Sequence, residues 1–245
     1  MDKKIIWLDT VNSTNSYSIK NYHSLNNFTL VCANHQTHGK GRREHTWYSP
    51  KNKNIYASFI LKGIQIDPLK ILMASSLALL NVLRHFSNND KFKIKWPNDI
   101  FFDNKKIAGI LAESYICEGK IEGVVIGIGL NVNMTEAELK SIEKPATSLL
   151  VATGKEHDIK EISKVLYRNL IEFINQPQVF KNSYIYEKWK SENFIIGKQI
   201  EILKDDKTCI HGKVVDIKES GSLYVFDDNG IFHTFDSGDV TIISF

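Results

Sequence analysis

Cysteine is scarce in this sequence, and the few cysteines present are not arranged in pairs. Cys32, Cys117 and Cys209 lie far apart, and no Cys-x-x-Cys pair occurs. Isolated cysteines in odd number argue against a disulfide framework and against a cysteine-ligated zinc site. The 8 histidines show no metal-ligand spacing either. We therefore expect reduced core thiols in a cytosolic protein, and no metal motif.

Long apolar runs and a strong charge imbalance are also missing. The N-terminal residues contain no apolar core of a secretory signal, and no run approaches the ~20 apolar residues of a membrane span. A net charge of +3 over 245 residues is too small for a general nucleic-acid coat. These absences predict a cytoplasmic protein without a membrane partner. The length allows one large domain, or a medium and a small one.

Two patterns of secondary structure follow one another along the chain. Strands are expected at 4–8, 28–33, 54–61, 92–96, 100–102, 107–115 and 121–130, and helices at 14–22, 69–86, 158–175 and 180–193. The strands between 92 and 130 are joined by short turns, which indicates an antiparallel or mixed sheet. After Gly197, short alternating strands with acidic and glycine turns are typical of a small all-β barrel. The sequence thus predicts two domains, residues 1–194 and 195–245.

A basic loop, residues 36–50, carries the densest positive charge near glycines. It reads Gln-Thr-His-Gly-Lys-Gly-Arg-Arg-Glu-His-Thr-Trp-Tyr-Ser-Pro. Two glycines one residue apart let backbone amides turn toward a ligand, and Lys40, Arg42 and Arg43 add charge beside them. Such a loop can hold a carboxylate or a phosphate. Taken alone, it is equally compatible with a solvated surface turn.

Four further segments place polar side chains at the ends of expected elements. They are Asp-Thr-Val-Asn-Ser-Thr-Asn at 9–15, Lys-Trp-Pro-Asn-Asp at 95–99, Lys-Lys-Ile-Ala-Gly-Ile-Leu-Ala-Glu at 105–113 and Gly-Ile-Gly-Leu-Asn-Val-Asn at 127–133. Each has a plain structural explanation: a helix cap, a strand-ending turn, a solvated lysine, or glycines that relieve crowding in a sheet. Individually, none of them indicates a function.

Together and in this order, the five segments resemble the biotin protein ligases, or biotin–[acetyl-CoA-carboxylase] ligases, over essentially the whole chain. The ordered set is G-x-G-R-x-x-x-x-W-x-S-P, K-W-P-N-D, K-x-A-G-I-L-x-E and G-x-G-x-N-x-N. The resemblance implies an α+β catalytic domain, with a mixed sheet backed by helices as in class II aminoacyl-tRNA synthetases, and a C-terminal SH3-like barrel. It also implies that biotin and ATP give biotinyl-5′-adenylate, from which a lysine of a biotin carboxyl carrier protein, an acetyl-CoA carboxylase subunit, takes biotin.

The motif match assigns residues of this chain to the two substrates. Those implied at biotin are Ser13, Thr14, Asn15, Gln36, Lys40, Gly41, Arg42 and Lys106. Those implied at ATP are Arg42, Arg43, Lys95, Asn98, Asp99 and Asn131. Lys106 and Arg42 are the expected catalytic residues, because two anions must be brought together. Lys40 should converge with both of them. Mg²⁺ is an expected cofactor, and Asp99 could either hold it or orient Lys95.

The basic loop departs from the family pattern at two places. Lys40 replaces an arginine, which keeps the charge but loses bidentate geometry. Glu44 and His45 replace a glycine and an arginine, and we therefore assign no phosphate contact to either residue. Trp47 is expected to anchor the end of the loop. Residues 134–145 are expected to fold over adenine, with 146–149 as the return, and to shield the adenylate from water.

Several alternatives limit the interpretation. Some members of the family carry an N-terminal DNA-binding module, but only 12 residues precede Ser13 here. We therefore expect a monofunctional ligase without a DNA partner. A lipoate or octanoate ligase of the same fold is the alternative enzyme. A nucleic-acid-binding protein is the alternative of another class, although the acidic turns after residue 197 argue against it. Monomer and homodimer both remain open.

Overall fold

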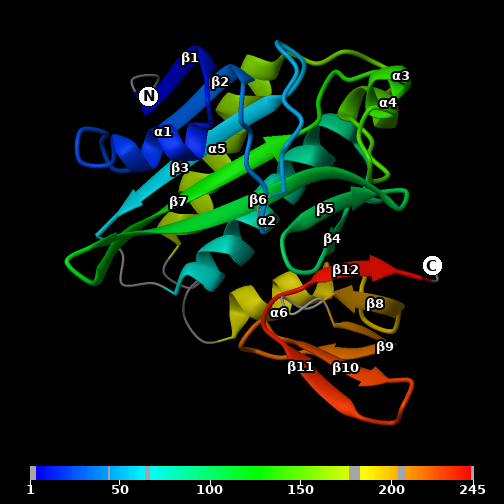
Figure 1. Ribbon diagram of the computed structural model, residues 1–245. Coiled ribbons are helices and arrows are strands. Elements are labelled where there is room, and N and C mark those ends of the chain that lie inside the picture. The colour runs from blue at the N-terminus through cyan, green and yellow to red at the C-terminus, as the bar shows by residue number, and fades with distance from the viewer. Residues whose placement is uncertain (1–3, 44, 64–66, 177–182, 204–207, 244–245) are drawn as a thin grey trace.

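The computed structural model describes residues 4–243 except 44, 64–66, 177–182 and 204–207. Its larger sheet is formed by β1 Ile5–Val11, β2 Leu30–Gln36, β3 Ile55–Lys62, β4 Lys93–Lys95, β5 Asp99–Phe102, β6 Lys105–Cys117 and β7 Lys120–Leu130. The strand order is β1-β2-β3-β7-β6-β5-β4 (Figure 1). β1 and β2 pair in parallel, while the other neighbours are antiparallel. The sheet is therefore mixed, as expected.

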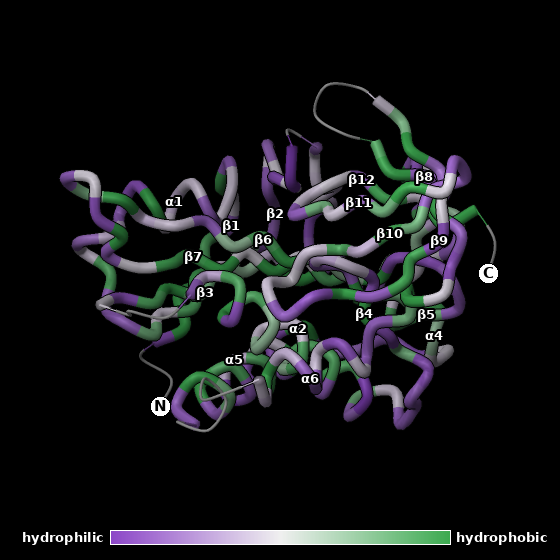
Figure 2. Tube along the Cα trace, turned by 90° about the horizontal axis from the view of Figure 1, so that it is seen from below, coloured by the Kyte–Doolittle hydropathy of each residue, from purple (hydrophilic) through white to green (hydrophobic). Residues whose placement is uncertain are grey.

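Helices cover both faces of this sheet. They are α1 Thr14–Lys20, α2 Pro68–Ser87, α3 Glu136–Leu139, α4 Leu149–Thr153, α5 Ile159–Asn175 and α6 Tyr184–Ser191. The long helices α2 and α5 lie on one side of the sheet with α6, and α1 lies on the other (Figure 2). β3 is buried along nearly its whole length, because its residues meet a core on each face.

The ends of the helices follow local capping chemistry. Ser13 caps α1, and Asp67 with Pro68 begins α2, close to the starts of the helices expected at 14–22 and 69–86. Asp158 caps α5 through its own carboxylate, whereas a complete capping box occurs at Thr135, before α3. The last helix was predicted from residue 180. Residues 180–182 lie outside the described residues, and α6 begins at Tyr184.

α2 is long and apolar enough to cross a membrane by length and composition alone, with a mean hydropathy of 1.3. The sequence predicted a helix over 69–86, although it counted no run as close to the length of a membrane span. The structure gives a different reason for its composition, because α2 packs within the main core beside α5. Ile71, Leu77 and Leu80 are among its fully buried side chains. The apolar run is therefore that of a core helix.

A second, smaller sheet follows α6. It consists of β8 Gln199–Leu203, β9 Cys209–Ile217, β10 Leu223–Asp227, β11 Phe232–Phe235 and β12 Asp239–Ile242, in the order β11-β10-β9-β8-β12. All its pairings are antiparallel, which is consistent with an SH3-like domain. Among the described residues the edge strands β11 and β12 do not pair, so the sheet is not the closed barrel that we predicted. The boundary at 194/195 stays a prediction.

The three cysteines are all free, but they differ in exposure. Cys32 is buried in β2, and burial raises the pKa of its thiol to about 12. Cys117 is partly exposed, and Cys209 is exposed at the start of β9. The expectation of core thiols is therefore wrong for two of them. Their positions at strand ends explain this, because an edge or end residue can face solvent.

Candidate functional site

A buried polar cluster forms where α1 begins. Thr14 donates from its backbone N–H (2.9 Å) and its hydroxyl (3.2 Å) to Gln36 Oε1. Ser58 Oγ lies 2.5 Å from Asn15 Oδ1 and 2.8 Å from Thr14 Oγ1. Because Ser58 has one hydroxyl proton, it can donate to only one of these oxygens at a time. The segments around 13–15 and Gln36 thus meet in one place, as predicted, and share adjustable hydrogen bonds.

The hydroxyls of Ser13 and Ser58 have different roles at this cluster. Ser13 Oγ accepts from the Ser16 backbone N–H, so its hydroxyl is a helix cap in this structure. Ser58 was not predicted, yet it joins Thr14 to Asn15. The signal was a serine in a largely apolar, buried strand, since a polar group in such a position needs partners.

Two glycines of β7 make room for the site. A Cβ at Gly127 would overlap the side-chain amide of Asn15, and a Cβ at Gly129 would overlap the indole of Trp47. Residues two apart on a strand face the same side. Asn15 and Trp47 are therefore neighbours on one face of β7. The two glycines do relieve crowding, and the groups they admit are those of the predicted site.

Lys106 stands between the indole and a carboxylate. Its Nζ lies 2.7 Å from Asp99 Oδ1 and 5.5 Å from the centre of the Trp47 ring system. Gly109 allows this approach, because a Cβ at this position would lie only 3.3 Å from Asp99 Oδ1 and from Lys106 Nζ. Asp99 was expected either to hold magnesium or to orient Lys95, and in the structure its Oδ1 forms an ion pair with Lys106.

Arg42 reaches the same bend from the basic loop. Its Nη1 donates to Asn98 Oδ1 at 3.3 Å, and Asn98 in turn donates to the Ile110 carbonyl at 2.6 Å. Arg42 and Lys106 are thus bonded to consecutive residues, Asn98 and Asp99. Two of the three cations expected to converge are therefore held by neighbouring residues of the same bend. Lys40 is exposed, its ammonium bonds to no residue in the described part of the chain, and its convergence stays a prediction.

The tip of the basic loop contacts the second sheet. Arg43 donates to the Leu203 carbonyl (3.2 Å) and to Ser237 Oγ (3.1 Å). His45 Nε2 lies 2.7 Å from Asp239 Oδ2. Burial alone would raise the pKa of Asp239, but His45 and nearby cations bring it below its usual value. These partners are far away in sequence, and sequence reasoning missed all of them.

The rest of the basic loop is closed by its own backbone. Lys40 and Thr46 form an isolated bridge, and the Gly41 N–H donates to the His45 carbonyl at 2.7 Å. The backbone N–H of Trp47 donates to the Gly39 carbonyl at 2.9 Å, which fits its expected role as an anchor. The Gly41 amide that we expected beside biotin is therefore engaged within the loop.

Lys95 also faces the second sheet. Its Nζ donates to the Val240 carbonyl at 2.5 Å and lies 5.2 Å from the Phe101 ring centre. Burial lowers the pKa of this ammonium. Next to it, Trp96 Nε1 donates to the Gly221 carbonyl at 2.8 Å. The bend at 95–99 is therefore fixed from the side of the smaller sheet.

Asn131 is buried and bonded within the protein. It accepts from Asn54 at 3.3 Å and donates to the Thr147 carbonyl at 3.0 Å. The returning segment also pairs with Lys106, whose backbone N–H donates to the Pro145 carbonyl at 3.0 Å. Residues 145–147 therefore run beside the catalytic candidate Lys106, a contact that the sequence did not predict. The contact with adenine stays a prediction for both Asn131 and residues 134–145.

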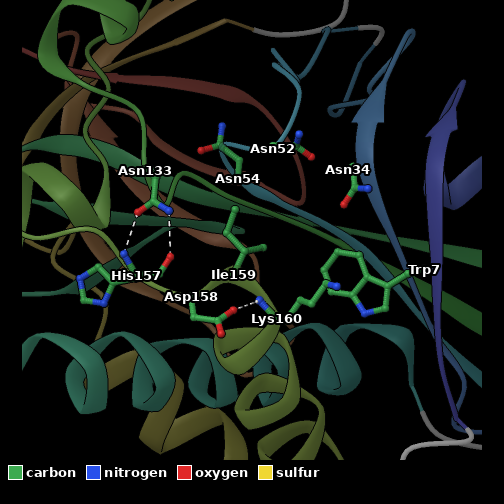
Figure 3. Close-up of a pocket in the computed structure, with 9 residues that line it drawn as sticks. All are labelled: Trp7, Asn34, Asn52, Asn54, Asn133, His157, Asp158, Ile159 and Lys160. Carbon is green, nitrogen blue, oxygen red and sulfur yellow. Dashed lines mark hydrogen bonds between the residues drawn. The ribbon is translucent and has the colours of Figure 1, made fainter.

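A separate cavity of about 240 Å³ lies beyond this cluster (Figure 3). It is lined by Trp7, Asn34, Asn52, Asn54, Asn133, His157, Asp158, Ile159 and Lys160. Asn133 faces His157 there, and the two residues exchange hydrogen bonds that fix the approach to α5. Among its described lining residues none is a predicted site residue. We place the site at the charged cluster, where reactive groups from several segments meet.

Comparison with known proteins identifies the family of this chain. The profile of the biotin/lipoate A/B protein ligase family matches residues 7–131. The chain is 30% identical over 243 residues to the bifunctional ligase/repressor BirA of Bacillus spizizenii, covering 94% of this chain and 72% of that one. It is 28% identical over 222 residues to the biotin--[acetyl-CoA-carboxylase] ligase of Paracoccus denitrificans, covering 88% and 91%. The matched region contains the basic loop, the bend and the β7 glycines.

The solved structures extend the likeness to the second sheet. The biotin protein ligase from Aquifex aeolicus in complex with biotin and ATP superimposes with a TM-score of 0.81 at 27% identity. The alignment covers 98% of each chain. Both sheets and their connection are therefore shared with that protein.

Proposed function

This chain belongs to the biotin/lipoate A/B protein ligase family, and we propose that it is a biotin protein ligase that joins biotin to ATP and then to a carrier lysine. First, the biotin carboxylate attacks the α-phosphorus of ATP, and pyrophosphate leaves. The product is biotinyl-5′-adenylate, a mixed anhydride. Next, the lysine amine attacks its carbonyl carbon, AMP leaves, and the nitrogen loses a proton. The names of the related ligases support both steps.

One observation carries this proposal: the polar cluster and the cations adjoin on one face of β7. Gly127 admits Asn15, Gly129 admits Trp47, and Lys106 lies over the Trp47 ring. Residues two apart on one strand face are about 7 Å apart. A neutral hydrogen-bonding site thus lies beside a cationic one. Biotin needs this pair, because its ring system is neutral and its tail ends in a carboxylate.

The polar cluster would bind the ring system of biotin. Thr14, Asn15 and Gln36 offer both donors and acceptors, which a cyclic urea requires. Ser58 belongs with them, because its hydroxyl can turn between Thr14 and Asn15. The cluster is buried, so these hydrogen bonds are made away from competing water.

Lys106 and Arg42 would stabilise the charge that develops between the two anions. Asp99 holds the Lys106 ammonium, and Asn98 holds the Arg42 guanidinium, so both cations are placed before the substrates arrive. Preorganised cations of this kind lower the barrier because they need not reorient during the reaction. Lys40, at the exposed side of the basic loop, would join them at the carboxylate.

The second sheet would support the nucleotide side. Arg43 and Lys95 were expected at ATP, and each donates a hydrogen bond to a carbonyl of the smaller sheet. We assign residues 195–245 the task of holding the basic loop against residues 1–194. Asn131 then keeps the returning segment beside Lys106.

A magnesium ion would accompany ATP and neutralise part of its phosphate charge. Mg²⁺ in ATP sites is typically held by one or two carboxylates and by the phosphates themselves. Asp99 fits that requirement, because its carboxylate has a second oxygen besides the Oδ1 that pairs with Lys106. The carrier would be the biotin domain of an acetyl-CoA carboxylase, as the names of related ligases suggest, and the reaction would take place in the cytoplasm.

The test is biotin-dependent exchange of labelled pyrophosphate into ATP. Exchange is expected with biotin, and lipoate or octanoate at the same concentration should not support it. Carrier labelling is then measured with an isolated biotin domain. Exchange driven by lipoate or octanoate and not by biotin would overturn the proposal in favour of another ligase of the same family.

A further inference from the structure

Three side chains of different chemistry meet on the smaller sheet, away from the site described above. Cys209 and His211 are two apart on β9, so both side chains leave the same face. Glu201 of β8 is paired directly with His211, while Leu203 is paired with Cys209. The ligand atoms of Glu201, Cys209 and His211 all lie within 4.8 Å of one another. From this arrangement we propose that the three residues form a binding site for zinc or a similar divalent transition metal.

The chemistry of the three donors selects the ion. Zinc is bound by thiolate, imidazole and carboxylate, and many sites use three protein ligands with a fourth position open to water. A thiolate favours zinc over magnesium or calcium. Metal–ligand distances of about 2.0–2.3 Å place neighbouring donors ~3.3–3.8 Å apart in a tetrahedron. His211 Nε2 and Glu201 Oε2 are already 3.1 Å apart, so small side-chain rotations complete the set.

Binding is balanced by release of one proton. A cysteine binds a metal as the thiolate, so its S–H proton must leave on binding. When the ion enters, the S–H proton passes to solvent and the sulfur bonds to the metal. No oxidant or reductant takes part.

A cavity beside Cys209 and His211 leaves room for the fourth ligand. It has a volume of about 390 Å³ and is lined by Cys209, Ile210, His211, Asp227, Asp228 and Asn229. The Asp228 backbone donates to the His211 carbonyl at 3.2 Å, which fixes this turn next to β9. Water can therefore reach the open coordination position.

A second cluster of the same composition is less suitable. The ligand atoms of His23, Cys117 and Glu122 also lie within 4.8 Å of one another. His23 Nε2, however, is 2.9 Å from the Tyr115 hydroxyl, and its ring meets Tyr22 and Tyr115 edge-on. The imidazole is already engaged there. This cluster therefore serves as the internal control.

The proposed metal would join the two strands that face the basic loop. Glu201 lies on β8, and Cys209 and His211 lie on β9, across the segment 204–207. Leu203, the cross-strand partner of Cys209, supplies the carbonyl to which Arg43 donates. An ion bound here would restrain the strand end that the basic loop contacts. The site itself does not depend on the proposed ligase activity.

Cobalt and zinc titrations of the full chain test this inference. Co²⁺ should give a thiolate charge-transfer band in the near ultraviolet and visible bands typical of tetrahedral coordination. Zn²⁺ should abolish both at one ion per chain, as counted with a competing chromophoric chelator. Cys209→Ser should remove the charge-transfer band. Cys209→Ser and His211→Ala should each weaken zinc binding by at least about 10- to 100-fold, the loss seen even for outer partners of metal ligands.

Two matched control variants test whether the metal binds at Glu201, Cys209 and His211 or at another cluster. Cys117→Ser removes the thiol of the other cluster, and His233→Ala removes another histidine–carboxylate pair of the same sheet, formed with Asp227. Both should bind cobalt as the parent does. A band lost in Cys117→Ser but kept in Cys209→Ser, or a parent chain that binds less than one ion, overturns the proposal. All four positions are outside the main core, and thermal unfolding in the presence of chelator checks that each variant is folded.

Discussion

The polar cluster and the basic loop lie next to each other but are held in different ways. In the polar cluster, three buried residues bond to one another: Thr14 of α1, Gln36 of β2 and Ser58 of β3. In the basic loop, Arg43 and His45 are bonded to residues of the smaller sheet. The polar cluster is therefore formed by the larger sheet and α1, whereas the basic loop is held by contacts with the smaller sheet.

This difference suggests a division of labour between a fixed and an adjustable half. A neutral ring is bound well by a rigid, dry pocket, because its hydrogen bonds need accurate placement. Phosphates are bound by charges that must also let pyrophosphate leave. A loop held by a few surface bonds can open and close for this purpose. Changes in the two halves should therefore affect different kinetic quantities.

The largest effect is expected for Lys106→Met. Loss of this cation removes charge stabilisation between carboxylate and phosphate, and biotin-dependent exchange should fall by about 10²- to 10³-fold. Binding of biotin alone, measured by calorimetry, should change much less. Lys105→Met is the matched control, since Lys105 is exposed on the same strand. Equal losses in both variants would assign the effect to the strand and not to the ammonium.

Arg42→Gly is expected to separate synthesis of the adenylate from its retention. The guanidinium is bonded to Asn98 and is placed to hold the α-phosphate. Hydrogen bonds to charged groups are worth about 1.5–3 kcal/mol, so the intermediate should dissociate about 10- to 100-fold faster. The released mixed anhydride should label lysines of unrelated proteins. Retention as tight as in the parent, measured by filtration of labelled adenylate, argues against this role, and Arg42→Lys tests whether charge alone suffices.

Local features of the fold could be predicted from the sequence, and long-range contacts could not. Ser13 and Asp67 are helix caps by local chemistry, and the mixed sheet followed from short turns between strands. Ser58 required knowledge of which strand lies beside α1. The partners of Arg43 and His45 lie more than 150 residues further along the chain, and no local pattern indicates them. The exposed Cys209 was missed for the same reason, because only strand pairing brings Glu201 to it.

Ser58→Ala tests whether the polar cluster binds biotin. The substitution removes the hydroxyl shared by Thr14 and Asn15, and loss of a buried hydrogen bond costs about 1–2 kcal/mol. Biotin affinity should fall by roughly 10-fold, while the KM for ATP changes little. Ser75→Ala is the control, because the hydroxyl of Ser75 is buried in α2 and bonds to the Ile71 carbonyl. That variant should lose stability without losing biotin affinity.

The smallest effect is expected where the basic loop meets the smaller sheet. Arg43→Ala removes donors to Leu203 and Ser237, and Ser237→Ala removes one acceptor. An ordinary hydrogen bond contributes about 0.5–1.5 kcal/mol, so the KM for ATP should rise by roughly 2- to 10-fold in Arg43→Ala, with biotin affinity unchanged. The double variant should resemble Arg43→Ala alone, because the bond is already lost. Additive effects would mean that the two residues act separately, and that the smaller sheet does not hold the loop through this contact.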